Sequence, residues 1–501
     1  MTEESAHWIF SVYPTLVLLA DLTVRIGLSI RVIMRKRPYG ITFAWLFVIL
    51  LFPFAGAIFY LFFGENRISD KRAARARQSQ DHYQYWLNSL KNRSPVKWDE
   101  KADTCLPLHN QAEKLIGIPA LAGNHLELID TPEEILQAIV DDIRGARSTC
   151  HLQFYIWQEG GMVSEIENAL LEVAGRGVTC RILLDSIGSS EFLKGQRAKT
   201  LMDAGIMIQA SLPAGIIKTL FARVDIRNHR KIVVIDGEIA YTGSQNMVDP
   251  KYFKQESGIG EWVDVMVRIT GPVVESLAGT FVSDWYLESD DQQATALDIG
   301  STIHDITRRT DVHQIERTGD TPVQLVPSGP GLVPDAIHSL LLTTIYSARD
   351  ELVLTTPYFV PDESLLTALK SAAQRRVNVT VILPQRNDSK LIHYASQAHF
   401  FELARSGVRI MQFRGGLLHS KTITVDREFC LFGSVNLDMR SFWLNFEATL
   451  FIYDRLFADK IRTLQARYED QSEEIDVHLF ERRPVINRFM ENLALLLGPL
   501  L

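Results

Sequence analysis

The chain has 501 residues, 46% of them hydrophobic, and a formal net charge of −8, so its length predicts about three folded units that each bury a core. This composition excludes a disordered chain, and the small acidic excess argues against a dedicated nucleic-acid binder. The four cysteines are scattered without a C-x-x-C pair, which excludes a disulfide scaffold and indicates reduced residues: Cys105, Cys150, Cys180 and Cys430.

The N-terminal 65 residues have the character of a membrane anchor with one or two transmembrane helices. Pro38–Gly64 is a run of 27 residues without a charge, and about 20 apolar residues are enough to cross a bilayer. The earlier apolar segment, Trp8–Val32, contains Asp21 and Arg25, which are four residues apart and could pair on one helical face. We expect this segment to be either a first span or an interfacial or re-entrant helix.

Residues 66–120 are expected to form a basic connector behind the anchor. Positive residues are nearly balanced between the two sides of the second apolar segment, so charge alone leaves the orientation open. The acidic start, Met1–Glu4, is unlike a cleaved signal peptide.

The rest of the chain contains an internal duplication, with one copy at 121–290, a polar linker at 291–320 and a second copy at 321–501. Each copy predicts a strand, an amphipathic helix and a second strand in the same order. This alternation favours an α/β fold with a mainly parallel sheet covered by helices on both faces. The six segments are 152–157, 165–174 and 178–184, followed by 352–358, 364–373 and 377–383.

One motif recurs at the same place in both copies. Each begins with H-x-K, continues through four residues to an aspartate, and reaches G-S-x-N after six more residues. The repeated spacing makes coincidence improbable. The motif residues are His229, Lys231, Asp236, Ser244 and Asn246 in the first copy, and His419, Lys421, Asp426, Ser434 and Asn436 in the second.

The spacing predicts how each motif is arranged in space. Histidine and lysine are two residues apart at the start of a strand, so they point to the same side. The glycine permits a close backbone approach, and the serine hydroxyl and asparagine amide can donate hydrogen bonds to an oxyanion. The aspartate falls on the other strand face, so we group it with the catalytic motif but expect it to support the loop.

This arrangement is suited to a phosphate diester, with lysines in the role that metal ions fill elsewhere. One histidine can attack phosphorus, while the other protonates the departing alkoxide and then deprotonates the incoming hydroxyl. We therefore predict a covalent phosphohistidine, with no cofactor and no metal.

Each imidazole needs an acceptor that fixes its tautomer. A second alternating strand follows each motif and begins with a carboxylate. Such a carboxylate either orients the histidine or is an ordinary solvated side chain. We expect Asp264 to orient His229, with Glu261 as an alternative, and Glu447 to orient His419.

The doubled H-x-K-x4-D-x6-G-S-x-N signature resembles the phospholipase D superfamily, and the resemblance extends over nearly the whole chain to bacterial cardiolipin synthases. Further residues that carry it are Arg227-Asn228, Trp262-Val263-Asp264, Asn436 to Phe442 and Asn445-Phe446-Glu447. The resemblance implies two repeats with mixed β-sheets flanked by helices, packed about a pseudo-two-fold axis behind an N-terminal transmembrane segment. It also implies His229 as the nucleophile and His419 as the acid and base.

The implied reaction transfers a phosphatidyl group from one phosphatidylglycerol to another, giving cardiolipin and glycerol. The implied partners are phosphatidylglycerol and anionic membrane lipids, without nucleic acid. The implied location is the bacterial inner membrane, with the catalytic part in the cytoplasm, and the oligomeric state is left open.

Several alternatives stay open at this point. The enzyme could be a membrane-bound phospholipase D that releases phosphatidic acid, a nucleic-acid diesterase, a synthase with phosphatidylethanolamine as donor, or a scaffold with a degenerate site. The apolar C-terminal stretch Val485–Leu501 could dock on a membrane or pack on the body.

Overall fold

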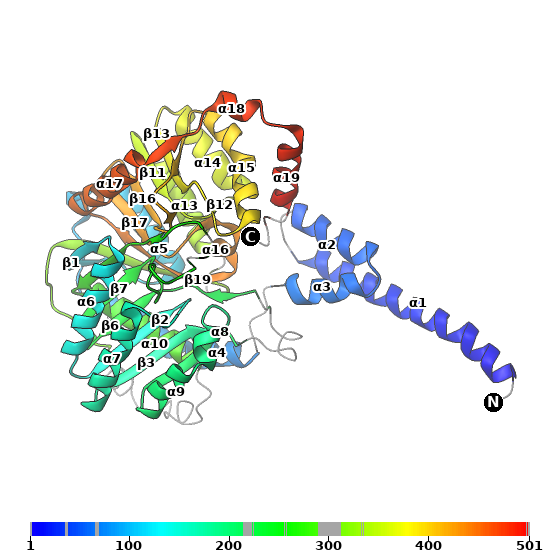
Figure 1. The fold of residues 1–501 in the computed structure, drawn as a ribbon, viewed down its shortest axis with the longest axis horizontal. Helices are drawn as coiled ribbons and strands as arrows, with labels where there is room; N and C mark the ends of the chain where they lie inside the picture. The colour runs from blue at the N-terminus through cyan, green and yellow to red at the C-terminus, as the bar shows by residue number, and fades with distance from the viewer. Residues whose placement is uncertain are drawn as a thin grey trace. The chain divides into compact units, whose positions relative to one another are not determined.

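The computed structural model in Figure 1 describes residues 3–35, 39–65, 70–213, 223, 225–254, 256, 258–288, 312–331, 333, 335–496 and 498. Most of the linker predicted at 291–320 lies outside the described residues. The chain forms two compact units, an N-terminal unit of residues 1–73 with 214–225, and a catalytic unit of residues 74–213 with 226–501.

The N-terminal unit contains a long helix followed by two short ones: α1 (Glu3–Met34), α2 (Tyr39–Leu51) and α3 (Ala55–Phe63). The uncharged segment expected as one span is therefore divided. Pro53 lies at the break, because proline lacks the N–H that an α-helix needs and clashes with the preceding turn. Among the described residues, no single helix combines the length and apolar content needed to cross a membrane.

The predicted contact between Asp21 and Arg25 is confirmed, with 2.5 Å between the carboxylate and the guanidinium. Asp21 also accepts a hydrogen bond from the N–H of Phe54 at 3.0 Å, and Arg25 donates to the carbonyl of Leu50 at 2.7 Å. These bonds connect α1 to the end of α2 and to the residue before α3. Asp21 and Arg25 therefore make polar contacts with each other and with neighbouring helices of the N-terminal unit.

A mixed β-sheet runs through the catalytic unit and contains both predicted repeats. Outward from the antiparallel pair β1–β10, the strand order is β1-β9-β7-β6-β2-β3-β4 on one side and β10-β19-β17-β16-β11-β13-β14-β20 on the other. Corresponding strands follow in the same order, which confirms the duplication. The strands are β1 (Leu121–Ile129), β2 (Thr149–Phe154), β3 (Thr179–Asp185), β4 (Met207–Ser211), β6 (Ile232–Ile235), β7 (Ile239–Gly243), β9 (Met266–Thr270), β10 (Thr321–Ser328), β11 (Glu351–Thr355), β13 (Asn378–Pro384), β14 (Arg409–Phe413), β16 (Thr422–Val425), β17 (Phe429–Gly433), β19 (Asn445–Ile452) and β20 (Ser472–Glu474).

The expectation of a mainly parallel sheet is wrong. Among the described residues, parallel pairing other than three two-residue pairs is confined to β2–β3–β4 and β11–β13–β14, which are the strands connected through helices. The strands that carry the motifs form hairpins instead, since β6 and β7 are joined by a short turn, as are β16 and β17. Such short connections produce antiparallel neighbours.

Helices cover both faces of this sheet. Helix α6 begins at Pro132, a residue favoured in the first helical turn, and buries Ile135, Ile139 and Ile143 at helical spacing. On the other face, α10 and α17 pack on the central strands. The helices of the repeats are α6 (Pro132–Gly145), α7 (Met162–Gly175), α8 (Ser190–Lys194), α9 (Gln196–Asp203), α10 (Val273–Glu288), α13 (Ala336–Ser347), α14 (Glu363–Gln374), α15 (Lys390–Arg405), α16 (Met439–Trp443), α17 (Arg455–Asp470), α18 (Val477–Glu481) and α19 (Val485–Leu496).

The segment expected as a connector packs on the catalytic unit. It contains α4 (Asp70–Leu90), the 3-10 helix η1 (Trp98–Glu100) and α5 (Cys105–Ile116). Trp86 of α4 is buried against α10, where a Cβ added at Gly279 would lie 2.3 Å from the indole. Glycine at this position therefore lets the two helices approach closely.

Candidate active site

Two pairs of very short parallel strands connect the repeats at the catalytic motifs. The first pair is β5 (Arg227–Asn228) with the start of β19, and the second is β15 (Leu417–Leu418) with β8 (Trp262–Val263). The pairing continues into each histidine, because His229 N–H donates to the Phe446 carbonyl at 2.9 Å and His419 N–H donates to the Val263 carbonyl at 2.8 Å. Each histidine thus lies beside the strand of the opposite repeat.

This exchange reverses the expected partners of the histidines. The Nδ1 atom of His229 lies 3.0 Å from the Glu447 carboxylate, and the Nδ1 atom of His419 lies 2.6 Å from the Asp264 carboxylate. The prediction that Asp264 orients His229 and Glu447 orients His419 is therefore wrong. The physical reason for the reversal is that β5 and β15 pair with strands of the opposite repeat. This pairing places the carboxylate of one repeat next to the histidine of the other.

The tautomer of both imidazoles follows from these contacts. An ionised carboxylate only accepts hydrogen bonds, so each Nδ1 carries the proton and each Nε2 retains its lone pair. The two histidines are accordingly prepared in the same way for chemistry at Nε2.

The motif serines have a different role from the one expected. Ser244 donates its hydroxyl to Asp264 at 2.6 Å and accepts from the N–H of Val265 at 3.0 Å. Ser434 makes the equivalent bonds to Glu447 and to the N–H of Ala448. Since both hydroxyl groups are engaged with the carboxylates, the serines fix the groups that orient the histidines, and the expectation of serine donors to an oxyanion is wrong.

The motif glycines permit this contact. A Cβ added at Gly243 would lie 2.4 Å from the carbonyl oxygen of Val265, and one at Gly433 would lie 2.2 Å from that of Ala448. Any larger residue would separate the motif strand from the strand that carries the carboxylate. The expected close approach of the backbone is therefore present in both repeats.

Both motif lysines are buried beside the histidines. Lys231 donates to the backbone carbonyl of His229 at 2.7 Å, and Lys421 makes the same bond to the carbonyl of His419. An ammonium group has three donors, so among the described residues these contacts leave donors for an anion. Lys231 also lies over the ring of Tyr155, with 5.7 Å from Nζ to the centroid.

Burial shifts the titration of these cations. Desolvation lowers the pKa of Lys231 to about 8, and it lowers the pKa of Lys421 well below its ordinary value, with the neighbouring Lys231 charge adding to the effect. Desolvation likewise lowers the pKa of both His229 and His419 to about 4. The histidines are therefore neutral at pH 7 and can act as nucleophile or base.

The two carboxylates remain ionised. Burial alone would raise the pKa of Asp264 and Glu447, but the neighbouring histidine and lysine in each case leave the pKa below its ordinary value. The resulting site contains two anionic acceptors, two imidazoles and two ammonium groups, all buried.

The motif asparagines provide further buried polar groups. Asn246 accepts from the N–H of Ile156 at 3.2 Å through Oδ1, whereas its Nδ2 has no partner among the described residues. The side-chain oxygen of Asn436 is also buried without a partner in this part of the chain. A buried polar group without a partner is costly, so a ligand that binds it would remove that cost.

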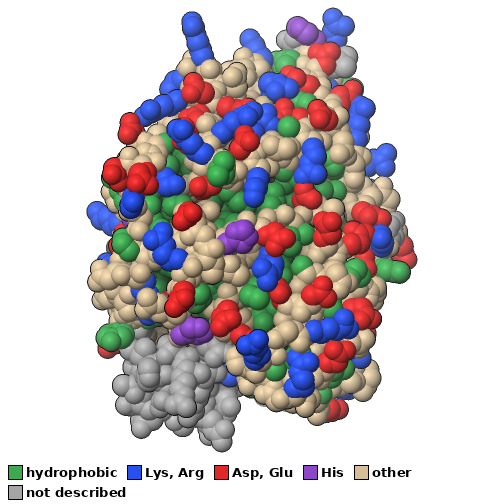
Figure 2. Space-filling view, turned by 90° about the vertical axis from the view of Figure 1, so that its left-hand side faces the viewer, with side chains coloured by type: hydrophobic (Ala, Val, Ile, Leu, Met, Phe, Trp, Pro, Cys, Tyr) green, Lys and Arg blue, Asp and Glu red, His purple; other side chains and the backbone are tan. Residues whose placement is uncertain are grey.

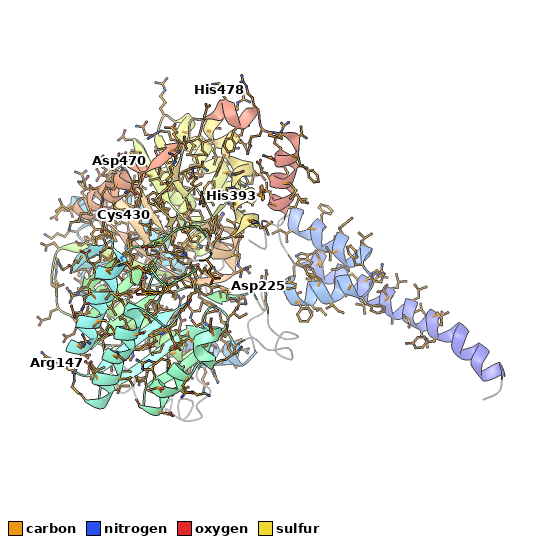
Figure 3. The ribbon with its side chains drawn as sticks, in the orientation of Figure 1. Arg147, Asp225, His393, Cys430, Asp470 and His478 are labelled. Atoms are coloured by element: carbon orange, nitrogen blue, oxygen red, sulfur yellow. The ribbon has the colours of Figure 1, made fainter. Side chains whose placement is uncertain are left out.

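The motif aspartates lie away from the histidines. Asp236 follows the end of β6, and its carboxylate accepts from the N–H groups of Arg147, Ser148 and Thr149 at 2.8 to 3.1 Å. Arg147 lies at the outer edge of the first repeat (Figure 3). Asp426 binds the three corresponding N–H groups, those of residues 349 to 351. These contacts agree with the expectation that the aspartates support the turn.

Sequence reasoning missed the buried arginine between His229 and Lys231. Arg230 forms an ion pair with Asp284 at 2.5 Å and donates to the backbone carbonyls of Glu447 and Ser328. It therefore holds the strand that carries the partner of His229. The corresponding residue of the second repeat is Ser420, so the two half-sites differ. The sequence shows this difference, because the residue between histidine and lysine is arginine in the first motif and serine in the second.

The surroundings of the two histidines also differ. The ring centroids of Trp262 and His419 are 4.3 Å apart, and Leu417 is the cross-strand neighbour of Trp262. At the equivalent place beside His229, the pair is Asn445 and Arg227. The short strand pair beside His419 is thus apolar, whereas the pair beside His229 is polar and cationic. Within the described residues, no group of three or more His, Cys, Asp or Glu side chains is arranged to hold a metal ion.

Comparison with known proteins gives two family matches. Residues 139–285 and 341–468 match the family described as "Cardiolipin synthase, PLD-like domain". Residues 25–65 match the family described as "Phospholipase D-nuclease N-terminal".

Curated relatives resemble the chain over almost its full length. Cardiolipin synthase A of Citrobacter koseri is 40% identical over 492 residues, which cover 98% of this chain and 99% of the relative. Cardiolipin synthase A of Yersinia pseudotuberculosis is 41% identical over 475 residues, covering 95% and 96%. Among solved structures, phosphatidylserine synthase of Haemophilus influenzae has a TM-score of 0.58 at 16% identity, covering 79% of this chain and 100% of that one, and it supports the fold alone.

Proposed function

This chain belongs to the phospholipase D-like cardiolipin synthase family, and from that membership we propose the chemical route that its site follows. The chain is an enzyme of the phosphatidyltransferase type, a cardiolipin synthase. The observation that carries the route is the pair of crossed half-sites, each with a neutral histidine, an ionised carboxylate and a buried lysine.

The first step forms a covalent intermediate on one histidine. Its Nε2 lone pair attacks the phosphorus of phosphatidylglycerol, a P–N bond forms, and the P–O bond to the glycerol head group breaks. The Nε2–H of the second histidine, in its protonated form, gives its proton to the departing alkoxide, so glycerol leaves neutral.

The second step transfers the phosphatidyl group. The second histidine, now neutral, takes the proton from a glycerol hydroxyl of another phosphatidylglycerol. That oxygen attacks phosphorus, the P–N bond breaks, and cardiolipin forms. The second histidine ends the cycle protonated, as it began.

The buried charges suit a phosphate that becomes more negative in the transition state. Lys231 and Lys421 approach from opposite repeats, and in a desolvated site their attraction for the phosphate oxygens is stronger than in water. The same negative charge stabilises an imidazolium, which accounts for a protonated second histidine although the protein surroundings alone give each histidine a pKa of about 4.

We also propose that the N-terminal unit resides in the bacterial inner membrane and that the catalytic unit faces the cytoplasm. The charged pair of Asp21 and Arg25 is held inside the unit, while large apolar side chains point outward. Exposed apolar groups around internal polar contacts are the arrangement that lipid favours. The outward side chains are Leu16, Leu18, Leu19, Leu22, Ile26, Ile30, Ile33, Phe43, Phe47, Leu50, Leu51 and Ile58.

Within this proposal, residues 1–65 serve as the anchor and 66–120 connect it to the catalytic repeats at 121–290 and 321–501. The lipids that approach the site are then phosphatidylglycerol and other anionic membrane lipids.

The test of this function is the lipid product. The purified chain in detergent with phosphatidylglycerol should form cardiolipin and free glycerol in equal amounts. The variants His229→Ala and His419→Ala should each remove most turnover, because one shared site needs both.

Three results would contradict parts of the proposal. Phosphatidic acid as the sole product would indicate a phospholipase D with water as acceptor. Cardiolipin formed only after phosphatidylethanolamine is added would identify that lipid as the donor. Retained turnover in one single-histidine variant would mean that the repeats do not share one site.

A further inference from the structure

The C-terminal helix α19 presents two different faces. One face packs on the catalytic unit, where Ala494 joins a small buried cluster with Val360 and Ala395. Glu491 on the same side is 2% exposed and forms an ion pair with Arg483 at 2.5 Å. These contacts hold the helix in a defined orientation.

The opposite face of α19 is apolar and exposed to solvent. Its side chains recur at intervals of three or four residues from Val485 through Phe489 and Leu493, which is the spacing of one helical face. The exposed fraction reaches 72% at Val485, 59% at Phe489 and 77% at Leu496. The complete face consists of Val485, Ile486, Phe489, Met490, Leu493 and Leu496.

On the side of the molecule shown in Figure 2, acidic and basic side chains are interspersed with apolar ones and no large apolar area is open. A contiguous exposed apolar face on a folded unit marks a binding surface.

Helix α19 contacts elements that lead to the second motif. The helix packs on α15, which carries His393 (Figure 3), and Gly498 lies against Val360 of β12 (Phe359–Val360). Strand β12 pairs with β18 (Leu437–Asp438), the two residues that follow Asn436 of the second motif. The helix is thereby linked to the second motif through β12 and β18.

Positive charge accompanies the apolar face. Arg482, just before α19, and Arg488, within it, are both exposed. Apolar side chains flanked by arginines are typical of helices that lie in the interface of a bilayer with anionic lipids.

We propose that α19 docks its exposed face onto an anionic lipid bilayer and so holds the mouth of the active site at the level of the lipid phosphates. The reason for that position rests on the proposed function, because phosphatidylglycerol presents its phosphodiester at this level. The contact itself is independent of turnover.

The direct test is a fluorescent label on the helix of the full-length chain. All four native cysteines are buried, so a cysteine introduced by Phe489→Cys is available to an environment-sensitive dye. The matched control is Leu456→Cys in α17, where the side chain is 78% exposed. Both proteins are reconstituted in vesicles of phosphatidylglycerol and phosphatidylcholine that contain brominated lipid as quencher.

The proposal predicts a blue-shifted emission at position 489 and at least threefold stronger quenching by brominated lipid than at position 456. Equal quenching at the two positions would overturn it. A blue-shifted but unquenched dye at 489 would also overturn it, because the face would then be covered by protein, either the N-terminal unit or a second copy.

A kinetic test separates docking from chemistry. The double variant Phe489→Glu/Leu493→Glu should lose at least tenfold in turnover of vesicle phosphatidylglycerol and stay within twofold on a monomeric short-chain phosphatidylglycerol. Leu456→Glu should retain turnover on both. Equal losses on the two substrates, or no loss on vesicles, would contradict docking. If even the unmodified chain makes no cardiolipin while position 489 is quenched, the proposed function fails and the docking stands.

Discussion

At the scale of single residues, the chemistry depends on which carboxylate serves which histidine. Sequence proximity suggests partners within one repeat, whereas the structure pairs His229 with Glu447 and His419 with Asp264. Neither half-site is complete without the other repeat. Each carboxylate therefore fixes the tautomer of the histidine in the opposite repeat. As a result, the activity expected of one repeat depends on the folding of the other.

The crossed pairing predicts a specific loss in the Glu447→Gln variant. Glutamine keeps the shape of the side chain but removes the charge that holds the proton on His229 Nδ1, so we expect turnover to fall by about 10²-fold to 10⁴-fold. The matched control is Glu261→Gln, since Glu261 is exposed and was the alternative partner expected from the sequence. Cardiolipin formation rates measure both. A large loss in Glu261→Gln and none in Glu447→Gln would contradict the pairing.

The buried lysines predict a decline of kcat/KM in alkali. In the proposed route Lys231 binds phosphate as an ammonium, and burial lowers its pKa to about 8, so its charge is present below pH 8 and is lost as the pH rises through that value. The Lys231→Arg/Lys421→Arg variant keeps both charges, because guanidinium does not titrate in this range. The kcat/KM of this variant should be lower than that of the unmodified chain at neutral pH, but it should stay constant up to pH 10. The same alkaline decline in both proteins would mean that another group titrates.

At the scale of elements, the motif aspartates join strands to neighbouring loops. Asp236 has a left-handed φ of 51°, and so does Asp426, in the turn that ends each motif strand. From that position each carboxylate accepts hydrogen bonds from three N–H groups where the chain enters β2 or β11. The turn thus aligns the motif strand with its neighbour in the sheet.

This role predicts that Asp236→Ala affects stability more than chemistry. Loss of the acceptor for three partly exposed N–H groups should lower the free energy of unfolding by about 1–3 kcal/mol. Asp236→Asn should lose less, because asparagine accepts hydrogen bonds and tolerates the left-handed conformation. Denaturant unfolding and turnover of the folded protein are the measurements. Unchanged stability with a loss of turnover as deep as that of His229→Ala would assign Asp236 to proton transfer instead.

Much of the fold was predictable from the sequence because its signals are local. The spacing of the motif located both histidines and both lysines, and runs of β-branched residues located strands such as β6 and β16. The partners of the histidines were not predictable, since they depend on β5 and β8, which are two residues long and have no periodicity. The division at Pro53 was also missed, because an uncharged run indicates lipid or burial but does not show where a helix ends.

At the scale of the whole molecule, duplication has produced one sheet and one site. The repeats meet at β1 and β10, and the exchanged strands β5 and β8 bring the two motifs together across this junction. The duplicated halves have since diverged, with Arg230 and Asn445 near one histidine and Ser420 and Trp262 at the corresponding places near the other. This inequality is expected to give the two histidines different tasks in one reaction.

The most direct test of the two-histidine mechanism is the trapping of the phosphatidyl intermediate. The chain is mixed with radiolabelled phosphatidylglycerol, quenched within milliseconds in sodium dodecyl sulfate at mildly alkaline pH, where a P–N bond survives, and digested, and the labelled peptide is identified by mass spectrometry. We predict label on a single histidine, His229 or His419, and its accumulation when the other histidine is replaced by alanine. Turnover to cardiolipin with no label on either histidine would contradict the shared two-histidine mechanism.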